Sequence, residues 1–290
     1  MQFRKGDRIR HPKMEGWGVG EVLEDSRGDS VPVFFVGAGK KILMLEYVQP
    51  IRLEGAEADS AILDNLKIPN QSTGIRYKSL PESIDGFLAL FPEGFYGDDF
   101  RAHERDYKDQ AHALALELLG ETELSDLLAR EQFEEIATRA MKVVSATNLL
   151  FPNEKMALRD GLRDPEGQKR FASALFDVLY GPGMLEGRFV EFSRVLTDLD
   201  AGKWTTASYF LFIVHPDKYM FVKPTMTQHA ADVCAYNINY TPQLNWETYK
   251  SVLAFSNYLR DAIAELKPRD MIDVQSFMWC VDPKNYQGSA

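Results

Sequence analysis

Residues 6–22 read GDRIRHPKMEGWGVGEV, and this stretch sets the expected fold of the first part of the chain. Gly6 to Arg10 is short, carries β-like residues and stops at a proline, as a brief strand does. Between Gly16 and Gly20 glycine alternates with Trp17 and Val19. Glycine at that density indicates tight turning and close approach of neighbouring backbones. The stretch therefore predicts the corner of a small barrel.

More short strands follow this corner. They are expected over Val31–Val36, Lys41–Leu45 and Val48–Leu53, with a turn at Ser26–Asp29 and a hairpin at Gly37–Gly39. Five short strands in so little chain favour a closed barrel, because closure removes unpaired edges. Residues 1–54 are thus expected to form a small N-terminal SH3-like β-barrel.

The charge of the chain changes at the same place as its pattern. The whole chain has a formal charge of -10, but residues 1–55 hold nine Lys/Arg and eight Asp/Glu, a net charge of +1. Residues 56–290 hold the other 24 Lys/Arg and 35 Asp/Glu, a net charge of -11. An acidic surface repels phosphate backbones, so electrostatic DNA binding by the second part is not expected.

The second part has helical periodicity. After a linker at 55–79, residues 80–283 are expected to form an α-helical domain, followed by a flexible tail at 284–290. Each expected helix is apolar on one side only, so the helices must pack on one another. The fold class is therefore multidomain α+β. Helices are expected over 80–90, 100–118, 133–144, 165–180, 185–199, 245–263 and 270–279.

Histidines and cysteines give no sign of a metal site. His103 lies on the expected apolar stripe with Phe100, Tyr107 and Ala111, which predicts a buried core histidine rather than a metal ligand. No H-x-x-x-H or C-x-x-C spacing occurs in the chain. No metal and no cofactor are therefore expected.

The two cysteines and the N-terminal segment bear on localisation. Cys234 and Cys280 are too few for a disulfide framework, and the start of the chain lacks an apolar leader. No run approaches the roughly 18 apolar residues that a membrane-spanning helix needs. A cytoplasmic protein with reduced thiols and no membrane partner is expected.

Motifs in the first part resemble a known family. They are Gly6–Pro12, Gly16–Val22, Val33-Phe34-Phe35 and Gly39–Leu43. This order is similar to the Tudor-like barrel at the C-terminus of UvrD/PcrA-type DNA helicases and, more distantly, to the RNA-polymerase-interacting barrel of CarD-type proteins. The resemblance covers about the first 53 residues and implies a docking module, chiefly for RNA polymerase. The helicase ATP-binding motif G-x-x-x-x-G-K-[ST] is absent.

The basic and aromatic residues of this module are the candidates for partner binding. Arg8, Arg10, His11, Lys40 and Lys41 either form a recognition edge or belong to a solvated surface. Trp17 is either an exposed aromatic anchor, a type enriched at interface hot spots, or part of the domain's own core. The candidate partner-binding residues are Arg8, Arg10, His11, Trp17, Lys40 and Lys41.

Three polar stretches in the helical part are candidates for a ligand site. They run over 147–155, 215–225 and 270–279, and the first leads on to Arg159. If the helices bring them together, their lysine, arginine and amide side chains could line a polar cleft for a phosphate or carboxylate. The alternative is helix capping and hydrogen bonding between helices. The candidate ligand-binding residues are Asn148, Lys155, Arg159, Lys223 and Gln275.

Three functions follow from these patterns. The leading interpretation is a non-enzymatic adaptor that docks through its barrel on RNA polymerase or a DNA-repair factor. No G-x-S-x-G elbow or other catalytic motif occurs, so no catalytic residue is assigned. The second interpretation is an enzyme or ligand-binding protein with its site in the helical domain. The third is weak nucleic-acid binding through the barrel, associated with defence, since residues 270–279 resemble the ends of helper domains in restriction and phage-defence proteins.

Overall fold

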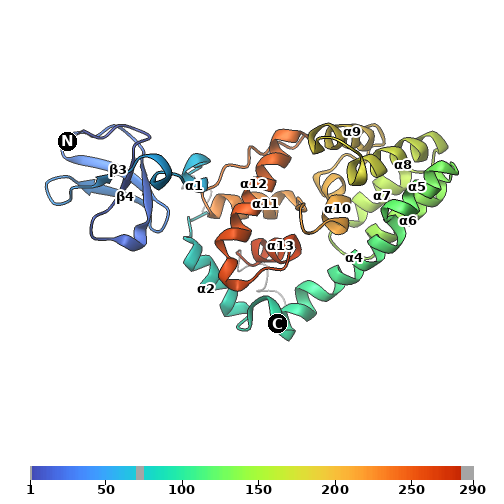
Figure 1. Cartoon of the computed structure of the whole chain (residues 1–290), viewed down its shortest axis with the longest axis horizontal. Helices are drawn as coiled ribbons and strands as arrows, with labels where there is room; N and C mark the ends of the chain where they lie inside the picture. Colours follow the sequence, from blue (N-terminus) through green and yellow to red (C-terminus); the bar gives the residue numbers. More distant parts are fainter. Residues whose placement is uncertain (1, 70–74, 282–290) are drawn as a thin grey trace.

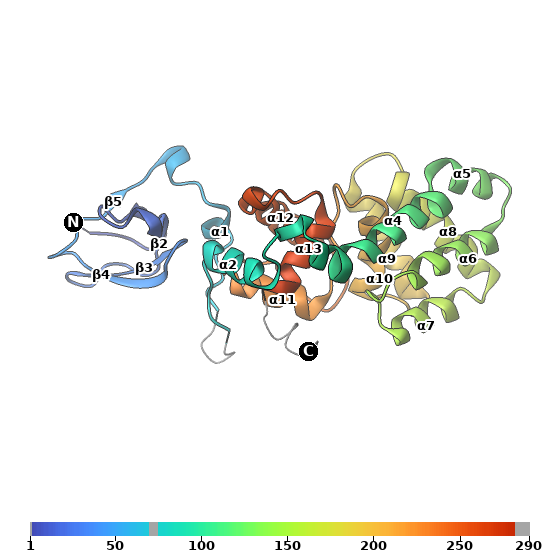
Figure 2. The ribbon, with the colours of Figure 1, turned by 90° about the horizontal axis from the view of Figure 1, so that it is seen from below.

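The structure, a computed structural model, describes residues 2–69 and 75–281. These residues form a small β domain and a larger helical body that lie end to end (Figures 1 and 2). The expected division into β and helical parts is confirmed. The expected tail at 284–290 and residues 70–74 of the expected linker lie outside the described residues.

The β domain is a five-stranded antiparallel sheet in the order β4-β3-β2-β1-β5. The sheet is not closed, so the expectation of a closed barrel was wrong: β4 pairs only with β3, and β5 pairs only with β1. The last strand has only two residues and forms a short edge of the sheet. The strands are β1 (Arg8–Arg10), β2 (Val19–Val22), β3 (Ser30–Phe35), β4 (Gly39–Met44) and β5 (Ile51–Arg52).

Glycines let the curved sheet pack tightly. A side-chain carbon on Gly20 of β2 would lie 2.6 Å from the ring of Phe35, which fills the core beside it. A side-chain carbon on Gly37 would lie 2.1 Å from the carbonyl oxygen of Gly16. These two close approaches require glycine at positions 20 and 37. The core beneath the sheet contains Phe3, Ile9, Val22, Val31, Val33, Phe35 and Leu43.

The two parts of the molecule meet at Phe34 of β3. Its ring is buried with Ile62 and Leu63 of α1 (Ala61–Asp64) and with Ala235 of the helical body. The ring of Tyr77 packs edge-on against Phe34 with 4.8 Å between the centroids. The described part of the segment between the sheet and the helices therefore contributes apolar side chains to a shared core.

The helical body begins with α2 and ends with α13, and none of its described helices is long and apolar enough to cross a membrane. Its principal helices are α2 (Leu80–Leu90), α4 (Asp106–Leu119), α5 (Glu121–Ala129), α6 (Phe133–Ser145), α7 (Pro152–Gly161), α8 (Pro165–Tyr180), α9 (Leu185–Asp198), α10 (Trp204–Val214), α11 (Pro224–Val233), α12 (Trp246–Ala262) and α13 (Met271–Cys280). Short turns η4 (Gly94–Tyr96), α3 (Asp98–Phe100) and η5 (Arg101–Arg105) connect α2 to α4.

Two helices lie in the centre of the body. Every residue of α10 is buried, and α13 is buried except for the partly exposed Trp279. Helix α13 contacts two apolar cores: Met278 faces the main one, and Phe277 packs against Phe87 in the smaller one. A helix enclosed on all sides has to satisfy its polar groups internally, and α13 carries several.

The start of the long helix differs from the sequence expectation. Arg101–Arg105 is π-helical and shifts the face that follows it. His103 is exposed, so the prediction of a core histidine was wrong. Glu104, Arg105 and Lys108 are buried instead, against α13. A regular helical period could not anticipate this shift.

Candidate functional site

Three of the candidate partner-binding residues lie together on the β domain. The ring of Trp17 is half-buried and lies 4.9 Å from that of His11 and 5.1 Å from that of Phe35. The ammonium of Lys41 lies 5.6 Å above the Trp17 ring, within reach of a cation–π contact. Trp17 is therefore neither fully exposed nor fully enclosed, and a basic group accompanies it.

The other three candidates are Arg8, Arg10 and Lys40. Arg8 is bound within the chain: its guanidinium lies 3.0 Å from the carboxylate of Glu21 and 2.9 Å from that of Asp64. Arg10 and Lys40 are exposed. Arg8 is therefore engaged within the chain, where it holds the β domain to α1.

The outer strand β4 carries apolar side chains in solvent. Ile42 is 64 % exposed and Met44 is 40 % exposed, and Tyr47 just beyond the strand is 78 % exposed. Ile42 and Met44 point to the same face because side chains alternate along a strand. Lys40 precedes them on this face. Sequence analysis singled out the lysines of this strand but not its apolar residues.

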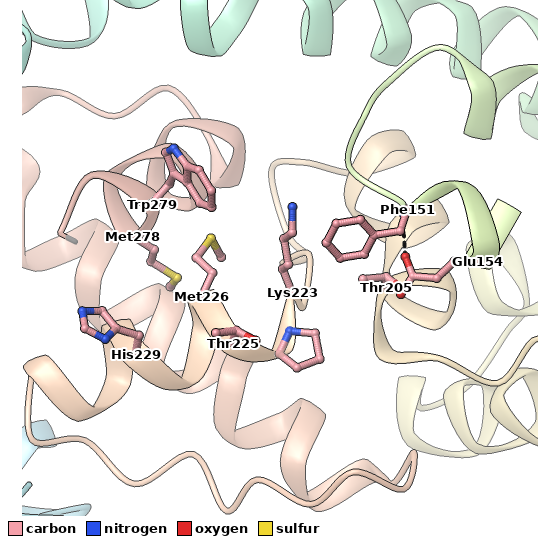
Figure 3. A pocket seen from close by; sticks show the side chains of 10 residues that line it. Phe151, Glu154, Thr205, Lys223, Thr225, Met226, His229, Met278 and Trp279 are labelled. Atoms are coloured by element: carbon pink, nitrogen blue, oxygen red, sulfur yellow. Dashed lines mark hydrogen bonds between the residues drawn. The ribbon is translucent and has the colours of Figure 1, made fainter. Parts of the chain in front are cut away.

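The three polar stretches of the helical body meet at one cavity of about 510 Å³ (Figure 3). Its wall is mostly apolar and comes from the start of α7, the start of α11 and the end of α13. The apolar residues are Phe151, Pro224, Met226, Met278 and Trp279. The polar residues are Glu154, Thr205, Lys223, Thr225 and His229.

Lys223 lies between two aromatic rings of this cavity. Its ammonium is 4.9 Å from the ring centre of Phe151 and 5.5 Å from that of Trp279 (Figure 3). Among the described residues no oxygen accepts a hydrogen bond from it, and burial lowers its pKa below the usual 10.5. The aromatic faces partly compensate for lost water, but the three N–H donors are left for another acceptor.

Three helices begin at the cavity. Phe151 precedes α7, Thr205 is the second residue of α10, and Lys223 precedes α11. The first turns of helices carry unsatisfied backbone N–H groups and a partial positive charge. Thr205 is 1 % exposed, and its hydroxyl has no hydrogen-bond partner among the described residues. The cavity thus presents several donors around an apolar space.

One carboxylate offsets this positive character. Glu154 lines the cavity, and its Oε2 accepts a hydrogen bond of 2.8 Å from the backbone N–H of Phe151. Glu154 is the third residue of α7 and thereby caps the backbone N–H of the residue before the helix. Its charge is opposite to that of Lys223 and counteracts the lowering of the Lys223 pKa.

The other candidate ligand-binding residues do not line this cavity. Asn148 is exposed, and Lys155 donates a hydrogen bond of 2.6 Å to the carbonyl oxygen of Thr147, which fixes the loop before α7. Arg159 lines a separate surface hollow between α6 and α8 with Arg163. Of the five candidates, the structure places only Lys223 in the wall of the cavity.

Gln275 belongs to a buried polar cluster centred on Lys108, which sequence analysis missed. Lys108 is fully buried, and its ammonium lies 2.7 Å from Gln275 Oε1, 2.8 Å from Ser276 Oγ and 3.3 Å from Glu104 Oε2. Burial lowers the pKa of Lys108, and Glu104 opposes that effect. Gln275 Nε2 lies 3.5 Å from Met226 Sδ, which connects the cluster to the cavity wall.

A second ionic group lies beside this cluster. Arg105 makes two parallel hydrogen bonds to Asp270, of 2.6 and 2.7 Å, and a third of 3.1 Å to Asp273. Arg269 also holds Asp273. Asp270 is the N-cap of α13 and accepts a hydrogen bond from Ile272. This group fixes the start of α13 against the end of η5 and thereby positions Trp279 at the other end of α13.

The described residues contain no group of three or more His, Cys, Asp or Glu side chains that could hold a metal ion. Both cysteines are buried, and they form no disulfide bond with each other. Burial raises the pKa of Cys234 to about 12, so its thiol stays protonated and unreactive at neutral pH.

Comparison with known proteins adds one match, confined to the β domain. Residues 3–51 match the model of a family described as a protein of unknown function, DUF3553. No curated protein matches the chain, and no solved structure matches it.

Proposed function

We propose that the protein is a non-enzymatic adaptor whose β domain docks on a protein of the transcription or DNA-repair machinery, such as RNA polymerase. The observation that carries the proposal is the apolar row of Ile42 and Met44 on β4, a strand that pairs on its outer side with no strand of the described residues. Exposed apolar residues on an unpaired strand edge favour association with another chain.

The chemistry of this edge favours an extended partner segment. A strand that pairs with β4 would gain main-chain hydrogen bonds, and its alternate side chains would meet Ile42 and Met44. Lys40 and Lys41 on the same strand favour acidic residues in the partner. The resemblance of this domain to the docking barrels of UvrD/PcrA-type helicases supports an RNA-polymerase-type partner.

Affinity purification from the host organism with nuclease treatment tests the proposal. The wild-type chain should enrich an RNA polymerase subunit or a repair factor, and Ile42→Asp should lose that protein. Val190→Asp is the matched control, because Val190 is 49 % exposed on α9 of the helical body. Failure of the wild type to enrich such a factor, or equal enrichment by Ile42→Asp, would contradict the proposal.

A further inference from the structure

The cavity around Lys223 has the size and wall of a small-molecule site. Its volume of about 510 Å³ lies in the usual range for such sites. Phe151, Met226, Met278 and Trp279 supply apolar and aromatic surface, and Lys223 lies among them (Figure 3). Sites of this kind combine an apolar wall with a few polar groups that orient the ligand.

Two polar side chains of the cavity have hydrogen-bonding groups without a partner among the described residues. The ammonium of Lys223 contacts two rings but no oxygen of the described residues. The hydroxyl of Thr205 is buried without a partner among the described residues. Buried polar groups normally have partners, so each of these two is suited to a ligand atom. The start of α11 adds backbone donors on the same wall.

We infer that this cavity binds a small organic anion with a flat apolar body. Its carboxylate or phosphate group would accept hydrogen bonds from Lys223 and from the start of α11, and its ring would lie against Trp279 and Phe151. Aromatic carboxylates and nucleoside monophosphates both present this chemistry. The inference concerns the helical body alone and goes beyond the proposed docking of the β domain.

The charge of Glu154 provides a second test of anion binding in this cavity. Its carboxylate lines the same cavity and repels an anion, so it weakens the binding that Lys223 favours. Glu154→Gln removes the charge and keeps an oxygen that can accept the hydrogen bond from the Phe151 backbone N–H, because glutamine also serves at this position. The variant should therefore fold normally and bind the anion more tightly.

Calorimetric titration of the full chain with two anions tests the inference. The probes are naphthalene-2-carboxylate and adenosine 5′-monophosphate, each paired with its neutral counterpart, 2-naphthamide or adenosine. At least one anion should bind, about tenfold or more tightly than its neutral counterpart, since charge-assisted hydrogen bonds are the strong ones. The anion that binds identifies the head group as carboxylate or phosphate.

Variants assign the binding to the cavity. Lys223→Met should lose the preference for the anion, and Glu154→Gln should increase the affinity. Lys218→Met is the matched control, because Lys218 is an exposed lysine five residues earlier, and its affinity should equal that of the wild type.

Three results would overturn the inference. One is the absence of saturable binding by either anion up to about 5 mM. Another is equal binding of an anion and its neutral counterpart. The third is unchanged or weaker anion affinity in Glu154→Gln. This result would overturn the inference even if Lys223→Met failed to fold.

Discussion

Lys108 and Lys223 both lie inside the helical body, but their surroundings differ. Lys108 is fully buried and meets oxygens of Gln275, Ser276 and Glu104. Lys223 is half-buried, and its ammonium meets only the rings of Phe151 and Trp279 among the described residues. A buried lysine with all its oxygen partners holds helices together, whereas one with open donors in a cavity is suited to a ligand.

The largest expected difference between the two sites is in stability. Lys108→Met leaves Glu104 and Gln275 buried without their cation, so the free energy of unfolding should fall by about 3–5 kcal/mol. Lys223→Met removes no hydrogen bond to a described residue and should change it by less than about 1 kcal/mol. Urea unfolding followed by circular dichroism measures both. Equal losses would remove the distinction between a structural and a binding lysine.

Two threonines allow the same comparison between a structural and a ligand-accessible side chain, with a smaller expected change in stability. Thr248 is fully buried and its hydroxyl donates a hydrogen bond of 2.6 Å to Asn239, so Thr248→Val should lower the free energy of unfolding by about 1–3 kcal/mol. The hydroxyl of Thr205 has no hydrogen-bond partner among the described residues, so Thr205→Val should be neutral or slightly stabilising. Thermal unfolding compares the two variants. A marked loss for Thr205→Val would show that its hydroxyl already serves the fold.

Anion binding should depend on pH through Lys223. Burial lowers the pKa of this lysine below 10.5, and only the protonated amine attracts an anion. The affinity for the bound anion should therefore fall by about tenfold as pH rises through that lowered pKa. Lys223→Arg stays charged and should lose this dependence. Calorimetry at several pH values measures the effect, and a wild-type affinity that is constant from pH 7 to 10.5 would argue against the role of Lys223.

The smallest expected effect is the binding of nucleic acid by the basic residues of the β domain. Arg8 is neutralised by Glu21 and Asp64, Arg52 lies 2.7 Å from Asp7, and the net charge of residues 1–55 is only +1, so the β domain attracts phosphates weakly. No gel shift with duplex DNA is expected at about 50 mM salt. A shift with a steep salt dependence would instead favour direct nucleic-acid binding.

The sequence predicted the elements better than the site. The spacing of apolar residues located α2 and α8 closely, because strong periodicity and a proline at the first turn mark such helices. It did not separate α10 as a helix, because a segment that is apolar on all sides carries no helical period. Closure of the barrel was wrong because pairing between the outer strands depends on tertiary geometry and not on local pattern.

The site was partly within reach of the sequence. The three polar stretches and Lys223 were identified from polar residues among aromatics, and the structure brings those stretches to one cavity. Lys108 and Glu104 were missed because the π-helical turn at Arg101–Arg105 rotates them inward. The role of Thr205 could not be predicted from the sequence. It depends on a hydroxyl without a hydrogen-bond partner among the described residues, and only the structure shows this.

Titration of the Lys223 amine most directly tests whether this lysine is open to a ligand. NMR of the chain with ¹³C-labelled lysine side chains follows each amine, and Lys223→Arg assigns the signal. We predict a midpoint below 10.5 in the free protein and a higher midpoint when naphthalene-2-carboxylate or adenosine 5′-monophosphate is bound, because a bound anion stabilises the ammonium. A midpoint at 10.5, or one that neither anion moves, would contradict the assignment of this cavity as an anion site.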